Sequence, residues 1–255
     1  MNPIDPLLEA LLGSEVPALN ANLNQRIVVS AGNRDWHQTL VPGLSICLLE
    51  NHVAPYPRLT ALLKLDAATT ATTTGGVDIP ANGLEILVEH GLIADDESEY
   101  VHPFYIRQPA DSFGTNQQFT LYPGSHRSDS TKHQLEFYVA TGQLAPTDTQ
   151  RRCINLSDHN LWLPGPVSHT EVMPLHMHNG NNSMLVRWDE SLSFKPKLDP
   201  NGEEVLVIHG TLTDDNGSYP AGSWIRNPVS AWQDWGAEAG TLIYYKNGHF
   251  GTANS

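Results

Sequence analysis

The stretch NGEEVLVIHG (residues 201–210) is the most informative part of this sequence, because NGLEILVEHG (82–91) repeats it almost letter for letter. Seven of the ten positions are identical, and the two stretches begin 119 residues apart. The same spacing separates YIRQP (105–109) from WIRNP (224–228). Two matches at one spacing indicate a tandem duplication, and such a repeat has to be recognised before the fold is assigned.

The repeat divides the 255 residues into two units of ordinary domain size. Each copy opens with a Trp and a Pro-Gly pair. Each closes with an aromatic strand, LEFYVATGQL (135–144) in the first copy and TLIYYKNGHF (241–250) in the second. The predicted parts are an N-terminal extension over residues 1–25, a first domain over 26–145 and a second domain over 150–250.

The extension contains a predicted short helix, DPLLEALL (5–12), because Asp5 suits the N-cap, Pro6 the first turn and Gly13 the end. The rest of the chain consists of short Val, Ile, Leu and Tyr runs separated by Gly, Pro, Asn and Asp, which is typical of antiparallel strands. Within TDDNGSYPAG (213–222) the Asn-Gly pair predicts a hairpin. The sequence therefore predicts an all-β protein with two sandwich or barrel domains.

Composition excludes several classes of protein. A formal net charge of −14 without any Lys/Arg cluster argues against a nucleic-acid partner, because such a field repels phosphates. With 40% hydrophobic and 16% charged residues the chain can bury a sizeable core. No apolar run approaches the roughly 18 residues of a membrane helix, and the N-terminus lacks signal-peptide features, so we expect a cytoplasmic protein without a membrane partner. Cys47 and Cys153 lack CxxC spacing, which predicts buried free thiols.

The segment EEVLVIHGTLTDDNGSYPAGSWIRNP (203–228) resembles the cupin domains of the ChrR type. Such domains occur in zinc-dependent anti-sigma factors and as free-standing single or tandem cupins. The family pattern is roughly HxHxxxEExLVLxG, then DxxGxYxxGxxxRNP, then PGSxH; the second copy matches its middle part closely and the first copy moderately. The resemblance implies two cupin barrels (double-stranded β-helix, or jelly-roll, domains) in tandem behind the short N-terminal helix.

The resemblance also implies a metal site in which two His of an HxH motif, a Glu and a later His hold one divalent ion. Imidazole and carboxylate ligands suit Zn, Fe, Mn or Ni. Counting from the shared Gly, the four positions in the second copy are occupied by Lys197, Asp199, Glu203 and, approximately, Gln233. In the first copy the positions are occupied by Asp78, Pro80 and Leu84, with the late His kept as His126 in YPGSH.

This departure from the family pattern predicts that neither copy binds a metal in the usual cupin manner. Lysine offers only donors and a positive charge, and proline offers no ligand. We expect Lys197, Asp199 and Glu203 to form a charge-paired network in place of the metal. A weaker metal candidate is the pair His176 and His178, because strand alternation puts both rings on one face. A solvated strand end or an intersubunit edge is the alternative interpretation of this pair.

Two further polar positions recur in both copies. Strand parity counted from Glu203 points His209 into the barrel, and His90 is its counterpart in the first copy. A hydrogen bond to backbone is the expected role of this His, and ligand binding is the alternative. Arg107 and Arg226 precede the shared Pro. Each is interpreted either as a buried Arg that bridges loop carbonyls or as a site of anion recognition.

Three functions compete at this point. The first is a binding protein that holds a small molecule in a barrel cavity, with Trp232 and Trp235 as an aromatic rim. The second, implied by the resemblance, is a metal-dependent dioxygenase acting on small ketones through His126, Glu85 or the His176 and His178 pair. The third is a regulatory sensor related to anti-sigma factors. A small-molecule ligand and a possible homodimer are the expected partners.

Overall fold

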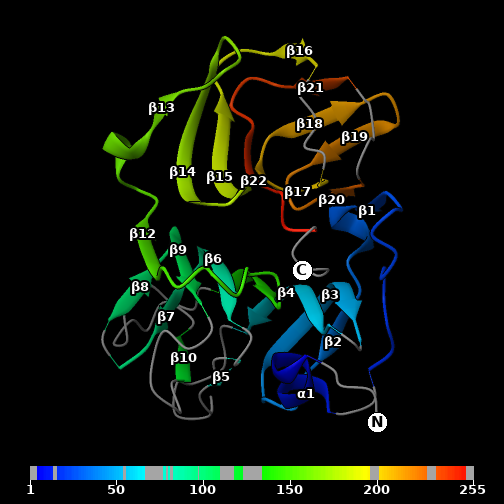
Figure 1. The fold of residues 1–255 in the computed structure, drawn as a ribbon, viewed down its shortest axis with the longest axis vertical. Coiled ribbons are helices and arrows are strands. Elements are labelled where there is room, and N and C mark those ends of the chain that lie inside the picture. The colour runs from blue at the N-terminus through cyan, green and yellow to red at the C-terminus, as the bar shows by residue number, and fades with distance from the viewer. Residues whose placement is uncertain are drawn as a thin grey trace. The chain divides into compact units, whose positions relative to one another are not determined.

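The computed structural model describes residues 5–13, 16–53, 56–66, 77–78, 80, 83–96, 98–109, 118–122, 134–195, 201–228 and 234–250. The chain forms two compact units. Unit 1 comprises residues 1–21 and 35–158, and unit 2 comprises residues 22–34 and 159–255. Apart from one α-helix and two short 3₁₀ turns, Ala31–Asn33 and His159–Leu161, the described elements are strands (Figure 1).

Unit 1 contains a seven-stranded and a four-stranded sheet, both antiparallel. The larger sheet has the order β12 (Arg152–Asn155), β9 (Phe104–Gln108), β6 (Leu84–His90), β11 (Leu135–Thr141), β4 (Arg58–Leu65), β3 (Leu44–His52), β2 (Trp36–Gln38). The smaller sheet has the order β5 (Val77–Asp78), β10 (Gln118–Tyr122), β7 (Leu92–Ala94), β8 (Glu99–Val101).

Unit 2 has the same two kinds of sheet, and its strands follow an equivalent order. The larger sheet runs β1 (Ile27–Val29), β20 (Trp224–Asn227), β17 (Glu203–His209), β22 (Leu242–Asn247), β15 (Asn181–Trp188), β14 (Thr170–His178), β13 (Leu163–Pro164). The smaller sheet runs β16 (Leu192–Phe194), β21 (Trp235–Ala237), β18 (Thr211–Asp214), β19 (Gly217–Pro220).

Each unit has a core cluster to which both of its sheets contribute. In unit 2, Val205 and Val207 of β17 and Ile243 of β22 pack in the same cluster as Leu212 and Trp235 of the smaller sheet. A shared core means that the two sheets face each other, as in a jelly-roll barrel. We call these paired sheets barrel 1 and barrel 2. The all-β prediction is confirmed.

The predicted N-terminal helix is present as α1 (Pro6–Leu12). The Asp5 side chain caps it by accepting a 3.0 Å hydrogen bond from the Leu7 backbone N–H, and Gly13 ends it with a φ of 85°. Its three buried leucines are Leu7, Leu8 and Leu11. All three belong to the core cluster of barrel 1, so the helix is part of that barrel and not a separate extension.

The division of the chain differs from the predicted boundaries at two strands. β1, in the segment predicted to open the first domain, pairs with β20 of unit 2. β12, which follows the first repeat, pairs with β9 of unit 1. Each is an edge strand of three or four residues. A short apolar run predicts a strand but not the sheet edge that it joins.

Two sequence-based expectations about single side chains are wrong. The register of β17 shifts at a β-bulge between Val207 and His209, so alternation no longer points His209 inward, and its ring is exposed. Its Nδ1 still lies 3.0 Å from the Gly240 carbonyl oxygen, which preserves the expected contact with backbone. Of the two free cysteines, Cys47 is buried as expected, whereas Cys153 is exposed. Within the described residues, no helix has the length and apolar character needed to cross a membrane.

Candidate ligand-binding cavity

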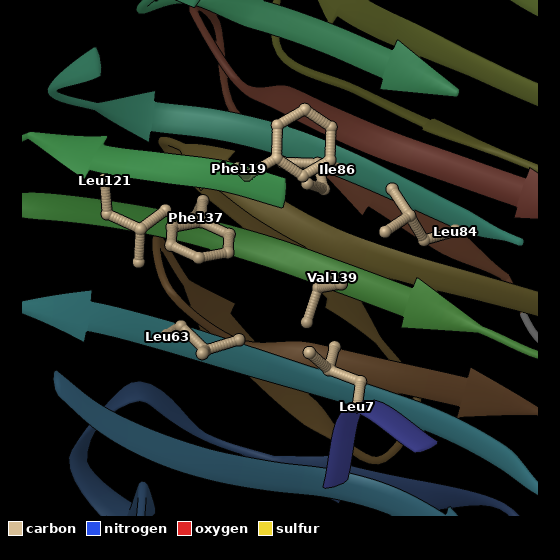
Figure 2. Close-up of a pocket in the computed structure, with 8 residues that line it drawn as sticks. All are labelled: Leu7, Leu63, Leu84, Ile86, Phe119, Leu121, Phe137 and Val139. Atoms are coloured by element: carbon tan, nitrogen blue, oxygen red, sulfur yellow. The ribbon is translucent and has the colours of Figure 1, made fainter. Parts of the chain in front are cut away.

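Among the described residues of barrel 1, eight apolar side chains surround a small cavity of about 20 Å³. The lining side chains are all apolar: Leu7, Leu63, Leu84, Ile86, Phe119, Leu121, Phe137 and Val139. Figure 2 shows Leu7 of α1 beside the residues that the strands contribute. A void of this size has room for about one water molecule at most, and its apolar walls offer that water no partner.

Barrel 2 contains a larger, partly open cavity of about 380 Å³. Its walls are formed by Pro166, Val167, Thr170, Val172, Met184, Val186, Trp188, Phe194, Lys195, Trp235, Ile243 and Tyr245. An apolar cavity of about 150 Å³ is already large enough to bind benzene in another protein. The volume and the lining are those of a small-molecule site.

β15 forms one wall of this cavity by strand alternation. Met184, Val186 and Trp188 occupy every second position and all line the cavity. Trp188 and Phe194 together form an aromatic part of the wall, and their ring centroids lie 5.7 Å apart. Trp235 pairs with Phe194 through β21 and β16. Trp235 thus borders the cavity of barrel 2 and also belongs to the core cluster of this unit.

At the end of the cavity away from Trp188, the lining residue Tyr245 contacts a buried carboxylate, that of Glu203. Glu203, at the start of β17, is 2% exposed. Its Oε1 accepts a 2.9 Å hydrogen bond from Asn227 Nδ2, and its Oε2 accepts a 2.8 Å hydrogen bond from the Tyr245 hydroxyl. Tyr245 itself lines the cavity and pairs with Met184. Both carboxylate oxygens of Glu203 are thus engaged by protein donors.

Arg26 extends this hydrogen-bond network away from the cavity. Its Nε donates to Asn227 Oδ1 at 2.9 Å, and its Nη2 donates to Asp214 at 2.5 Å and to the Tyr219 hydroxyl at 2.9 Å. Burial and the hydrogen bond to Asp214 raise the pKa of Tyr219. Asp214 Oδ1 also accepts from the backbone N–H groups of Asn216 and Gly217. The DxxGxY motif of this copy therefore builds a turn and a network, not a catalytic group.

The same network recurs in unit 1 but stops short of the barrel interior. Arg151 Nε donates to Gln108 Oε1 at 2.9 Å, and its Nη2 donates at 2.7 Å to both Asp95 Oδ2 and the Tyr100 hydroxyl. Burial, followed by the hydrogen bond with Asp95, raises the pKa of Tyr100. The positions of Glu203 and Tyr245 are occupied in this unit by apolar residues, Leu84 and Val139.

Two predicted site residues lie on the other face of their strands. Arg226 is fully buried, and its Nη2 donates to the carbonyl oxygens of Asn22 at 2.9 Å and Gln25 at 3.3 Å. The interpretation as an Arg that bridges loop carbonyls is confirmed, and a role in anion recognition is not supported. Glu85 alternates with core residues and lies 2.7 Å from Arg107 Nη1, so it does not face the interior of barrel 1.

His176 and His178 share one face of β14, as alternation predicts, with ring centroids 6.4 Å apart and planes 18° from parallel. His176 pairs with Ser183, which alternates with the cavity-lining Met184. The two rings consequently face away from the cavity. Among the described residues, no three His, Cys, Asp or Glu side chains are grouped as metal ligands would be.

The remaining predicted residues fall mostly outside the described part of the chain. These are Lys197, Asp199, Gln233, His126 and Trp232. Asp78 lies in β5 opposite Gln118 of β10, and only its backbone is described.

A divalent metal of the usual cupin kind does not fit the groups that the described residues of the two barrels provide. In barrel 1 the Glu position is Leu84, within a wholly apolar lining. In barrel 2 the carboxylate oxygens of Glu203 both accept hydrogen bonds. The stretches 196–200 and 229–233, which cover the other family positions, contain no His or Cys in the sequence.

Sequence reasoning missed four residues of this site: Arg26, Trp188, Asn227 and Tyr245. A signal for Tyr245 was present in the comparison of the two copies. Glu203 and Tyr245 are both polar where Leu84 and Val139 are apolar. Two positions that change together in this way indicate side chains that meet.

The geometry defines a cupin-fold protein with an open second barrel, and comparison with known proteins agrees. Residues 149–251 match the ChrR Cupin-like domain, which confirms the resemblance to this type of cupin for unit 2. No curated protein matches the sequence.

Solved structures of the same fold cover most of the chain. A proposed dioxygenase from Nostoc punctiforme has a TM-score of 0.64 and 14% identity over 89% of this chain and 84% of its own. The pirin YhhW from Escherichia coli, solved with nickel(II), has a TM-score of 0.60 and 11% identity over 87% and 98%. Quercetin 2,3-dioxygenase from Acinetobacter baumannii has a TM-score of 0.59 and 11% identity over 88% and 85%. At these identities the likeness concerns the fold alone.

Proposed function

We propose that this protein binds a small, mostly apolar molecule inside barrel 2 and that barrel 1 serves as a structural partner domain. The observation that carries the proposal is the difference between the two interiors. Within the described residues, the cavity between the sheets of barrel 1 measures about 20 Å³, and the cavity of barrel 2 measures about 380 Å³ and has aliphatic and aromatic walls. Cores are normally packed without such voids, so a retained cavity of this size favours a ligand.

The proposed function does not involve the metal that the resemblance to ChrR-type cupins implies. Lys197 and Asp199 replace the two His of the HxH motif, and Glu203 is held by Asn227 and Tyr245. We infer a degenerate metal site whose remaining carboxylate orders the cavity. Lys197, Asp199 and Gln233 stay candidates for ligand contacts, because they lie next to cavity residues in the sequence.

We also infer that the two units arose by duplication. The repeated decamer supports this inference, and so does the equivalent order of strands in the two pairs of sheets. After duplication, the first barrel became filled by apolar side chains and α1, while the second kept its space.

Naphthalene is a suitable probe, because it is uncharged, rigid and smaller than the cavity. Equilibrium dialysis is expected to show one molecule bound per chain. Met184→Trp places extra volume in the cavity and should weaken binding at least about tenfold. Met177→Trp is the matched control, because Met177 lies on the same hairpin and is 67% exposed. This control should bind as the unchanged protein does.

Equal binding by the two tryptophan variants would show that the probe sits elsewhere and would overturn the proposal. Oxygen consumption after addition of Fe(II) would instead favour the dioxygenase alternative, to which two of the similar structures owe their names. That result would require metal ligands beyond those in the described part of the chain.

A further inference from the structure

The cavity wall of barrel 2 carries aromatic side chains at positions that are aliphatic in barrel 1. Four of the described lining residues are aromatic: Trp188, Phe194, Trp235 and Tyr245. The two units have an equivalent strand order, so the ladder registers match each of these positions to one in unit 1. Three of the four positions are occupied there by aliphatic residues, which are Leu65, Val77 and Val139.

Phe194 shows how this match is made. It pairs with Trp235 across the ladder of β16 and β21, just as Val77 pairs with Phe119 across the ladder of β5 and β10. Aromatic side chains are larger than the aliphatic ones at the matched positions, yet the described cavity of barrel 2 is the larger of the two. These rings therefore do not serve to fill the barrel, and they form the wall that a ligand meets.

Phe194 is the aromatic residue at the Trp188 end of the cavity that offers surface to a ligand. Trp188 and Trp235 are each 4% exposed, whereas Phe194 is only partly buried. The Trp188 ring packs against Phe194, with the ring centroids 5.7 Å apart and the planes 31° from parallel. A ring that is already held by its neighbour loses little conformational entropy when a ligand packs on it.

Polar side chains of the described wall are engaged within the protein. The Thr170 hydroxyl donates to a backbone carbonyl oxygen, and the Tyr245 hydroxyl donates to Glu203. The Lys195 ammonium lies 3.4 Å from an Asp234 oxygen, and its side chain is 82% exposed. Among uncharged ligands of one size, the choice therefore depends on how each packs against the aromatic and aliphatic surfaces.

We propose that barrel 2 selects aromatic ring compounds over aliphatic rings of the same size, and that Phe194 determines this selectivity. This inference rests on the proposed function and adds the ligand class to it. Aromatic rings attract each other in offset-stacked or edge-to-face arrangements, which is equivalent to roughly two- to tenfold in affinity beyond the area that they bury. An aliphatic ring buries its area against the same wall but lacks this attraction.

Toluene and methylcyclohexane test the inference, because both are uncharged and have the same carbon connectivity. Phe194→Leu replaces the aromatic ring by an aliphatic side chain. Headspace gas chromatography, which measures the free hydrocarbon above a protein solution, should show that this variant lowers the ratio of toluene to methylcyclohexane affinity at least about threefold. Methylcyclohexane should still bind to it.

Two further variants control for the substitution. Phe194→Tyr keeps the ring and should keep the affinity ratio. Phe104→Leu makes the same change at a partly buried Phe that packs against the core cluster of barrel 1 and does not line the barrel 2 cavity. This variant should also leave the ratio unchanged.

Nuclear magnetic resonance gives a second readout, which a merely structural role for Phe194 would not produce. In protein with labelled phenylalanine, the ring signal that is absent from the Phe194→Leu spectrum should show nuclear Overhauser effects to the toluene protons. An unchanged affinity ratio in Phe194→Leu, or the lack of these effects while toluene is bound, would overturn the inference and leave cavity binding intact. Failure of both hydrocarbons to bind would instead overturn the proposed function.

Discussion

At the scale of single residues, the two barrels differ most clearly at one pair of positions. Glu203 and Tyr245 meet through a 2.8 Å hydrogen bond in barrel 2. Their counterparts in barrel 1, Leu84 and Val139, line the small apolar void. A hydrogen-bonded pair and an apolar pair are both self-consistent, whereas a mixed pair takes one hydrogen-bond partner from the polar group that remains.

Glu203→Leu should therefore destabilise the protein by about 2–3 kcal/mol, because it takes the acceptor from Asn227 and Tyr245. The double variant Glu203→Leu/Tyr245→Val copies barrel 1. It should cost less than the sum of the two single variants, since the residues interact directly. Urea unfolding at constant m-value measures all three. Glu238→Leu, at an exposed position, serves as the control, and strict additivity would contradict the prediction.

The tyrosine of the unit 1 network predicts a dependence of stability on alkaline pH. Burial and Asp95 raise the pKa of Tyr100 above its ordinary value near 10, so the folded protein keeps its proton at pH values where the unfolded chain loses it. This contribution is complete below about pH 10 and declines as the pH rises further. Tyr100→Phe should therefore lose less stability between pH 9 and pH 11 than the unchanged protein. Tyr56→Phe, at a 62% exposed position, should follow the unchanged protein in these unfolding curves.

At the scale of elements, α1 explains why barrel 1 is filled. A seven-residue helix is too short to be stable alone, and its leucines gain stability from the core that they enter. Leu7→Ala should enlarge the void shown in Figure 2 and cost about 3 kcal/mol in urea unfolding. Glu9→Ala, on the exposed side of the same helix, should change stability by less than about 0.5 kcal/mol. Similar costs for the two variants would show that Leu7 does not support the core.

The elements also show how far the sequence could predict this structure. The helix cap at Asp5 and the alternation in β17 are local patterns, and both were predictable. The bulge before His209 was not, because one extra residue in a ladder leaves no mark in composition. The cavity of barrel 2 could not be predicted from the sequence for a different reason. Val172 and Val186 look like core residues in the sequence, and only the three-dimensional structure shows that the space beside them is empty.

At the scale of the whole molecule, β1 belongs to unit 2 although the chain then continues into unit 1. Its segment, residues 22–34, contributes three ladder pairs to unit 2 and makes side-chain contacts with it as well. Arg26 reaches Asp214 and Asn227, and the carbonyl oxygens of Asn22 and Gln25 receive the buried Arg226. Unit 2 therefore depends on a segment that precedes nearly all of unit 1 in the sequence.

This dependence predicts that residues 159–255 expressed alone form a weakened unit 2 that a synthetic peptide of residues 22–34 restores. Without the peptide, the edge of β20 and the buried Arg226 lose their partners, so the thermal midpoint should fall by several degrees. Added peptide should raise it again in a concentration-dependent way. A peptide with Arg26→Ala should bind at least about tenfold more weakly, since it lacks a partly buried ion pair and two further hydrogen bonds. Asn24→Ala, at an exposed position, should bind normally. A fragment that ignores all three peptides would show that unit 2 is complete without β1.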